Sequence, residues 1–230
     1  ELKNIKDKDA RVYNAQLRDK QLQNEQQKME MKMLASQINP HFLYNTLESI
    51  RMQALTSGNR NVANSIKLLG KSMRYVLENT GTADTSLQAE IDHILTYLQI
   101  QQLRFGDRVN YILTVEPGMN LEEYRVLPLL LQPIVENGIV HGLEARENDG
   151  TIWISIYVQD NVVYTDISDN GCGMDEETLQ TVMAKVENYT RKRHKSSIGL
   201  YNINRRIKLN YGEQYGLEIQ STLGEGTMVR

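Results

Sequence analysis

The spacing of apolar residues changes near Gly106, and this change restricts the folds that the chain can adopt. Before Gly106, apolar residues recur every three or four positions, as they do in amphipathic helices. After it, residues 108–115, 151–158 and 162–167 form strand-like runs, with helical segments between some of them. Because strands and helices do not alternate strictly, the second half predicts a mixed α/β sandwich rather than a doubly wound sheet. The whole chain is therefore predicted to be α+β, with a helical part first.

Residues 1–35 predict a coiled-coil stalk. Their apolar side chains fall on the a and d positions of one heptad register, namely Ile5, Val12, Ala15, Leu22, Met29 and Met33. Asp19 and Gln26 also occupy a positions, where polar residues set the register of a parallel dimer at a cost in stability. A single solvated helix is the alternative, but the pattern runs directly into the next helical segment, which favours the stalk.

Residues 36–105 predict a helical domain that forms a homodimer. Two successive helices carry apolar stripes, composed of Leu43, Leu47, Ile50 and Ala54 in the first and Val62, Ile66, Leu69, Met73 and Val76 in the second. A third helix is expected over residues 87–103. Two amphipathic helices bury little surface alone, whereas the four that a dimer supplies would form a bundle.

The motif Pro40-His41-Phe42-Leu43-Tyr44-Asn45 places a histidine in the first of these helices. Pro40 cannot donate a hydrogen bond, and its ring crowds an earlier carbonyl, so a bend is expected there. At about 100° per residue, His41 lies opposite the apolar stripe, together with Asn45 and Glu48. The imidazole is therefore expected to point outward, as a catalytic group or as an ordinary surface histidine.

A glycine loop follows a predicted hairpin that turns at Asp160-Asn161. In the loop Asp169-Asn170-Gly171-Cys172-Gly173, the glycines would let the backbone pass close to a planar base. Asp169 could accept a hydrogen bond from an exocyclic amine of that base. An ordinary Asn-Gly turn is the alternative.

Asn137 lies in an apolar helix predicted over residues 129–141, where an asparagine is costly unless it has a partner. Its carbonyl oxygen suits Mg²⁺, which takes one or two protein oxygens together with phosphates and water. A helix cap is the alternative role. Glu136 beside it could hold a water, act as a base or simply be exposed.

Residues 198–211 predict a helix that follows the polar, basic segment 188–197, whose composition is typical of a mobile loop. Backbone N–H groups at a helix N-terminus favour anions, so phosphates would be stabilised there. The basic run 191–195 could close over them or could be merely solvated. Strands are expected on both sides of Gly224-Glu225-Gly226.

Composition excludes several classes of protein. The net charge of -3 argues against nucleic-acid binding driven by phosphate neutralisation. The most apolar stretch, residues 126–135, has about half of the roughly twenty residues that a bilayer span requires, so membrane contact is expected only through a missing N-terminal region. A single cysteine cannot form an internal disulfide. We interpret the chain as a fragment of a longer protein.

Taken in order, the motifs resemble those of bacterial sensor histidine kinases of two-component systems, in the branch called LytS-like or YesM-like. Residues 40–45 are similar to the phospho-acceptor box and residues 132–137 to the N-box of that branch. Residues 169–173 and 197–202 resemble its glycine boxes, and residues 224–227 resemble the closing motif of the Bergerat-type ATP fold. The resemblance covers nearly everything after about Leu34.

The resemblance implies an ATP-dependent protein-histidine kinase, in which residues 106–230 form the ATP-binding domain. His41 would accept the γ-phosphoryl group of Mg-ATP and pass it to an aspartate of a response regulator. Asn45 and Glu136 would have catalytic roles, and the acceptor of the histidine proton stays open between Glu136 and Glu48. The protein would be the cytoplasmic portion of a homodimer anchored in the bacterial inner membrane.

The resemblance also implies the residues of the ATP site. Asn137 would bind Mg²⁺, Asp169 would read adenine, and Thr227 would support the adenine site. The other implied contacts are His141, Gly171, Gly173, Gly199, Leu200 and Asn202, with residues 185–197 as a lid. Two alternative functions remain, an ATPase clamp of Bergerat fold and a catalytically silent signalling scaffold.

Overall fold

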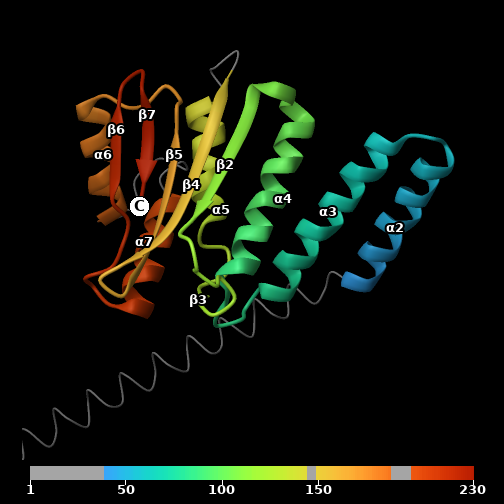
Figure 1. Ribbon diagram of the computed structural model, residues 1–230, viewed down its shortest axis with the longest axis horizontal. Coiled ribbons are helices and arrows are strands. Elements are labelled where there is room, and N and C mark those ends of the chain that lie inside the picture. Colours follow the sequence, from blue (N-terminus) through green and yellow to red (C-terminus); the bar gives the residue numbers. More distant parts are fainter. Residues whose placement is uncertain (1–38, 144–148, 188–197) are drawn as a thin grey trace, which may run out of the picture.

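The computed structural model describes residues 39–143, 149–187 and 198–230. The predicted stalk and the basic segment 188–197 lie outside the described residues. Figure 1 shows a helical hairpin at one end, a sheet covered by helices at the other, and the long helix α4 between them. None of the described helices combines the length and apolar character needed to cross a bilayer.

The helical hairpin consists of α2 (Pro40–Thr56) and α3 (Arg60–Asn79). Asn39 caps α2, since its side-chain oxygen accepts a hydrogen bond from the backbone N–H of Phe42 at 3.2 Å. Asn59 caps α3 in the same way, through the N–H of Val62 at 3.2 Å. The bend expected at Pro40 stays a prediction, because the helical segment before it lies outside the described residues. Asn39 is extended and Pro40 starts α2, where a missing N–H is harmless.

Much of the apolar surface of this hairpin is uncovered in a single chain. Ala63 is the buried residue among those of α2 and α3. Three residues predicted to face inward, Ile50, Val62 and Leu69, are more than two-fifths exposed. The other exposed apolar side chains of α2 are Phe42, Met52 and Leu55. The hairpin alone therefore does not bury the stripes that the sequence predicts.

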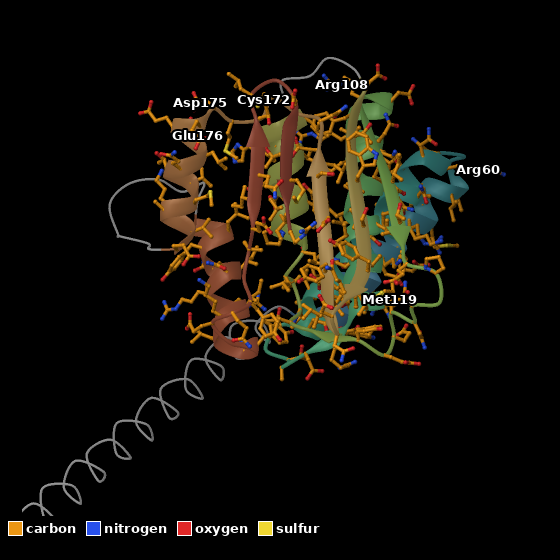
Figure 2. All side chains as sticks on the ribbon, turned by 60° about the vertical axis from the view of Figure 1, so that its left-hand side comes forward. Arg60, Arg108, Met119, Cys172, Asp175 and Glu176 are labelled. Carbon is orange, nitrogen blue, oxygen red and sulfur yellow. The ribbon has the colours of Figure 1, made fainter. Side chains whose placement is uncertain are left out.

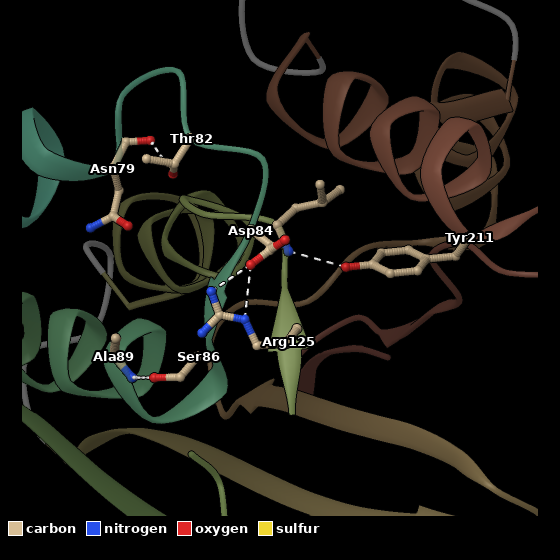
Figure 3. A network of polar contacts seen from close by, with 8 residues as sticks. Asn79, Thr82, Asp84, Ser86, Ala89, Arg125 and Tyr211 are labelled. Carbon is tan, nitrogen blue, oxygen red and sulfur yellow. Dashed lines mark hydrogen bonds and ion pairs between the residues drawn. The ribbon is translucent and has the colours of Figure 1, made fainter. Parts of the chain in front are cut away.

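The helix α4 (Leu87–Phe105) joins the hairpin to the sheet. It begins after Ser86, whose hydroxyl accepts a hydrogen bond from the N–H of Ala89 at 3.2 Å, and it ends at Gly106. A small sheet that the sequence did not predict precedes it, in which β1 (Thr85–Ser86) pairs with β3 (Arg125–Val126). An ion pair between Arg125 and Asp84 closes this corner (Figure 3).

The main sheet has the strand order β2-β4-β5-β7-β6. Its strands are β2 (Val109–Val115), β4 (Gly150–Gln159), β5 (Val162–Asp169), β6 (Ile219–Thr222) and β7 (Gly226–Val229). The pair β2–β4 is parallel and the other pairs are antiparallel, so the predicted mixed sheet is confirmed. The predicted hairpin turn is confirmed too, because Asp160 and Asn161 both have positive φ, as a tight hairpin requires.

One hydrophobic core lies between the sheet and the helices α4, α5 (Gln132–Asn137), α6 (Glu176–Glu187) and α7 (Ile198–Tyr211). Inward side chains of β4, Ile152, Ile154 and Ile156, are fully buried there. Leu87, Ile91, Ile94 and Leu98 of α4 belong to the same core. The predicted boundary between residues 105 and 106 stays a prediction, since α4 packs with the sheet that follows it.

The helix predicted over residues 129–141 begins later than expected. Leu129 has a φ of 55°, in the left-handed region, which excludes it from a right-handed helix. The helix α5 therefore starts at Gln132. It is followed by a wider π-helical turn, Gly138–Leu143, of a kind often found at functional sites.

Candidate functional site

A cavity of about 300 Å³ lies between α5, α6, α7 and the strands β5, β6 and β7. This volume is at the lower end of the range of small-molecule sites, about 300–1,000 Å³. Six of the residues predicted for the ATP site line it: Asn137, His141, Asp169, Gly173, Leu200 and Thr227. Apolar side chains complete the lining, among them Ile134, Ile167, Met174, Val182, Ile219 and Val229. The sequence therefore predicted most of the polar side of the cavity.

Asp169 ends β5 inside this cavity, packed against backbone. Its Oδ1 atom accepts a hydrogen bond from the N–H of Gly171 at 2.8 Å. A Cβ atom on Gly142 would lie 2.6 Å from the same Oδ1 atom, so only glycine fits there without a shift. The close contact between Gly142 and Asp169 also packs the π-helical turn against β5. The carboxylate is thus fixed in direction by its neighbours, as recognition of one edge of a base requires.

The glycine loop after Asp169 contacts the start of β4 on one side and the end of β6 on the other. Asn170 accepts a hydrogen bond from the N–H of Thr151 at 2.8 Å and donates one to the carbonyl of Asp149 at 2.9 Å. Gly173 has a φ of 60° and contacts Thr222 so closely that a side chain would overlap its carbonyl. Figure 2 shows Cys172 of this loop at the same end of the sheet as Asp175 and Glu176.

Gly171 is required by packing, although it is not among the residues that line the cavity. A side chain there would overlap the backbone of Gly142. The N–H of Cys172 donates to the carbonyl of Gly142 at 3.1 Å, and this bond keeps the glycine loop close to the π-helical turn. The loop and the π-helical turn therefore hold each other in place.

Asn137 and Glu136 are adjacent in α5 but lie on different sides of it. Asn137 is half-buried and lines the cavity, whereas Glu136 is exposed and is not among the lining residues. The pKa of Tyr97 is raised to about 12, chiefly by burial and also by the negative charge of Glu136, while Arg104 opposes the rise. Glu136 is therefore placed beside α4, outside the cavity.

The start of α7 contributes less to the cavity than its motif predicts. Leu200 lines it, but Gly199 and Asn202 are not among the lining residues, and Asn202 is exposed. The buried polar residue of this helix is Asn204, which sequence reasoning missed. It donates to the carbonyl of Val186 at 3.2 Å and accepts from the N–H of Leu217 at 3.0 Å. These two bonds join α7 to the end of α6 and to the segment before β6.

His41 is exposed in the first turn of α2, as predicted. The amide nitrogen of Asn45, one turn later, lies 3.2 Å from its Nδ1 atom and 3.4 Å from its Nε2 atom. Glu48 is bonded to Arg51, whose guanidinium lowers the pKa of that carboxyl. In Figure 1, α2 lies at the opposite end of the molecule from α6, β6 and β7, which surround the cavity.

The residues of the cavity fit a nucleotide. Asp169 offers a fixed acceptor for an exocyclic amine, and the apolar lining suits a planar base. Among the described residues, no group of three or more His, Cys, Asp or Glu side chains could hold a metal ion. The side-chain oxygen of Asn137, which lines the cavity, is of a type that suits Mg²⁺, since this ion usually takes one or two protein oxygens together with phosphates and water.

The fold and the cavity define a class, a helical hairpin followed by an α/β sandwich ATPase domain. Two family models match in the corresponding order. The "Histidine kinase" model matches residues 29–109, and the model "Histidine kinase-, DNA gyrase B-, and HSP90-like ATPase" matches residues 125–230.

Curated relatives agree with these matches. The chain is 34% identical over 201 residues to "Sensor histidine kinase YesM" of Bacillus subtilis, covering 87% of this chain and 32% of the relative. It is 33% identical over 214 residues to "Sensor histidine kinase YpdA" of Escherichia coli, covering 92% and 36%. It is 34% identical over 201 residues to "Sensor protein LytS" of Oceanobacillus iheyensis, covering 87% and 34%.

The chain belongs to the sensor histidine kinase family, and the resemblance to its LytS-like and YesM-like branch is confirmed. It spans about a third of the length of the curated relatives it matches. The ATPase-type domain matched at residues 125–230 implies ATP binding, and the cavity lies within this domain.

Proposed function

We propose that this chain is the kinase portion of an ATP-dependent protein-histidine kinase that phosphorylates His41. The observation that carries the proposal is the convergence of Asn137, Asp169 and Thr227 on one cavity. The same chain presents an exposed histidine, with Asn45 at hydrogen-bond distance, on a separate helix. These two features support the proposal of a nucleotide site and a phosphate acceptor in one chain.

In this proposal, Asp169 accepts a hydrogen bond from the adenine amine, and Thr227, its neighbour across the β5–β7 pair, supports it. Asn137 supplies an oxygen to Mg²⁺, whose charge would neutralise the phosphates. A ring nitrogen of His41 forms a bond to the γ-phosphorus as the bond to the bridging oxygen breaks and ADP leaves. Catalysis is then mainly positioning and charge neutralisation.

The histidine proton needs an acceptor, and Glu48 and Glu136 are the two candidates. Glu48 is on α2, two helical turns from His41, but it is bonded to Arg51. Among the described residues, none of the ion pairs involves Glu136, which is exposed beside α4. We therefore favour Glu136, which would reach His41 only when the hairpin and the ATPase domain approach each other. Phosphate would then pass from His41 to an aspartate of a response regulator.

We also propose that the hairpin forms a homodimer. The apolar side chains left exposed on α2 and α3 support this, since two hairpins together would cover them in a four-helix bundle. In Figure 1, α2, which carries His41, lies at the opposite end of the molecule from α6, β6 and β7, so transfer requires a rearrangement or the cavity of the partner. Mixing His41→Gln with Asp169→Asn separates these routes, because only transfer between chains would restore phosphorylation.

Membrane attachment and a cytoplasmic position for this chain stay predictions of the family resemblance. We propose that a region outside this chain anchors the protein in the bacterial inner membrane. Fractionation of cells that express the complete gene tests this. Recovery of the protein with the membranes is expected, and recovery in the supernatant would contradict it.

The kinase proposal is tested with ATP labelled on its γ-phosphate in the presence of Mg²⁺. We expect a label that is lost in acid, survives alkali and is absent from His41→Gln. Asp169→Asn should also abolish it by weakening ATP binding, whereas Asp166→Asn should not. Asp166 is the matched control because it lies on the same strand but faces Arg230 on the other side of the sheet.

Two other results would favour the alternative functions. Steady release of phosphate without a labelled protein would favour an ATPase clamp. Absence of ATP binding would favour a silent scaffold.

A further inference from the structure

Glu90 is a fully buried carboxylate on α4 that bonds to α3 and to the segment before α5. It lies on α4 and is 0% exposed. Its Oε2 atom accepts hydrogen bonds from the hydroxyl of Tyr75 on α3 and from the N–H of Leu129 at 2.9 Å. Its Oε1 atom accepts from the N–H groups of Leu130 at 2.7 Å and Leu131 at 2.9 Å. Within the described part of the chain, no ion pair involves Glu90, so these four donors stabilise its charge.

The three backbone N–H groups belong to the segment that leads into α5. This segment is strained, because Leu129 adopts a φ of 55° without being glycine. Arg206 of α7 binds the carbonyl oxygens of the same segment. It donates hydrogen bonds to the carbonyl of Pro128 at 2.7 Å and to that of Leu129 at 3.4 Å. Glu90 therefore binds the N–H groups of this segment, and Arg206 binds its carbonyl groups. The start of α5 is fixed by them, and Asn137 lies at its other end.

A second contact between α4 and the start of α5 is made by His93. His93, one turn after Glu90, is buried, and its Nε2 atom lies 2.7 Å from the side-chain oxygen of Gln132, the first residue of α5. The imidazole stacks on Tyr75, with ring centroids 4.3 Å apart and an angle of 18° between the planes. The single side chain of Tyr75 on α3 therefore contacts both α4 residues that hold the start of α5.

We propose that Glu90 is a positioning residue and that Tyr75 couples the nucleotide cavity to the hairpin that carries His41. Glu90 sets where α5 begins and so where Asn137 stands in the cavity. A shift of α5 on nucleotide binding reaches α3 through the hydroxyl of Tyr75. The coupling itself requires only nucleotide binding, whereas its effect on phosphorylation rests on the proposed kinase function.

The test compares two tyrosines that each donate a hydrogen bond to a carboxylate. Tyr75→Phe removes the bond to Glu90 and keeps the ring that stacks on His93. Tyr157→Phe removes a similar bond, from Tyr157 to Asp166 at 3.2 Å, on the outer face of the sheet. Hydrogen exchange of each protein is followed with and without ADP and Mg²⁺.

In the parental protein and in Tyr157→Phe, the nucleotide should slow exchange both in α5 and in α3. In Tyr75→Phe, the slowing should persist in α5 and disappear from α3. The affinity for ADP should change by less than about twofold, while the rate of His41 phosphorylation falls about tenfold, since a hydrogen bond to a charged group is lost. A kcat effect without an affinity effect separates positioning from a simple loss of stability.

Glu90→Gln provides a second variant. It places an amide N–H₂ group against backbone donors, so it should weaken ADP binding as well. The proposal is overturned if Tyr75→Phe keeps nucleotide-dependent protection of α3, or if the parental protein never shows it. Loss of the kinase function would appear instead as an unlabelled parental protein, and the exchange experiment would still decide the coupling.

Discussion

The carboxylate of Asp169 lies directly against the backbone of Gly142, with no room for a side chain between them. Asp169 ends β5, and Gly142 belongs to the π-helical turn after α5, so this contact joins two segments far apart in the sequence. The turn carries His141, and the strand end leads into the glycine loop. The contact therefore sets the shape of the cavity at the position where we propose that adenine binds.

Gly142→Ala should weaken ATP binding, because its Cβ atom would lie 2.6 Å from the Oδ1 atom of Asp169. The carboxylate or the turn would have to move, and the acceptor would leave its position. We expect a loss of at least about tenfold in affinity, measured by calorimetry with ADP and Mg²⁺. Gly70→Ala on α3 is the control, since its Cβ atom would make only an ordinary contact with Leu47 at 3.9 Å. Equal affinity of the two variants would contradict the role given to this contact.

Asn204→Ala should lower the free energy of unfolding by about 2 kcal/mol, because buried partners in two segments lose their hydrogen bonds. The matched control is Asn202→Ala, two residues earlier on the same helix, where the side chain is exposed. Urea denaturation followed by circular dichroism measures both. A similar loss in the two variants would show that Asn204 does not hold α6 and α7 together. ADP binding by Asn202→Ala then tests whether that residue contacts nucleotide at all.

Acid should weaken the start of α6 through Asp175. Hydrogen bonds from the side chain and the backbone N–H of Thr178 lower the pKa of Asp175 below its ordinary value of 3.8. Because the pKa is lower in the folded state, this contribution to stability is present above pH 3.8 and is lost as the pH falls through the folded pKa. Asp175→Asn can still cap the helix but does not titrate.

The unfolding midpoints of the parental protein and of Asp175→Asn should therefore converge as the pH falls from about 6 to about 3. The two should differ most at the higher pH, where the parental carboxylate is charged. A gap between them that is independent of pH would mean that the charge of Asp175 makes no contribution.

The features that the sequence predicted correctly are those that depend on neighbouring residues. The turn at Asp160-Asn161, the helix that begins at Leu87 and the strand before Asp169 follow from local conformational preference or from the spacing of apolar residues. Six of the residues expected in the ATP site line one cavity. Most of them could be recognised in the sequence because they belong to short family motifs.

The features that the sequence missed depend on contacts between distant segments. Glu90 bonds to residues about forty positions later, and Asn204 bonds to Val186 and Leu217, so neither partner set can be recognised from local pattern. The hydrogen bonds from Leu129, Leu130 and Leu131 to Glu90 are also long-range, and they accompany the start of α5 at Gln132 instead of at residue 129. Gly199 and Asn202 follow their motif in sequence, but their places on α7 keep them out of the cavity lining.

The central claim is that the ATP cavity supplies phosphate to His41, and locating the phosphate on the chain tests it most directly. The chain has four histidines, and phosphate on each of them would have a different meaning for the mechanism. His93 is buried, His141 lines the cavity, and His194 lies outside the described residues. After incubation with ATP and Mg²⁺, peptides prepared without acid are sequenced by tandem mass spectrometry. We predict phosphate on His41 in the parental protein and none in Asp169→Asn. Phosphate on His141, or on any residue other than His41, would contradict the account.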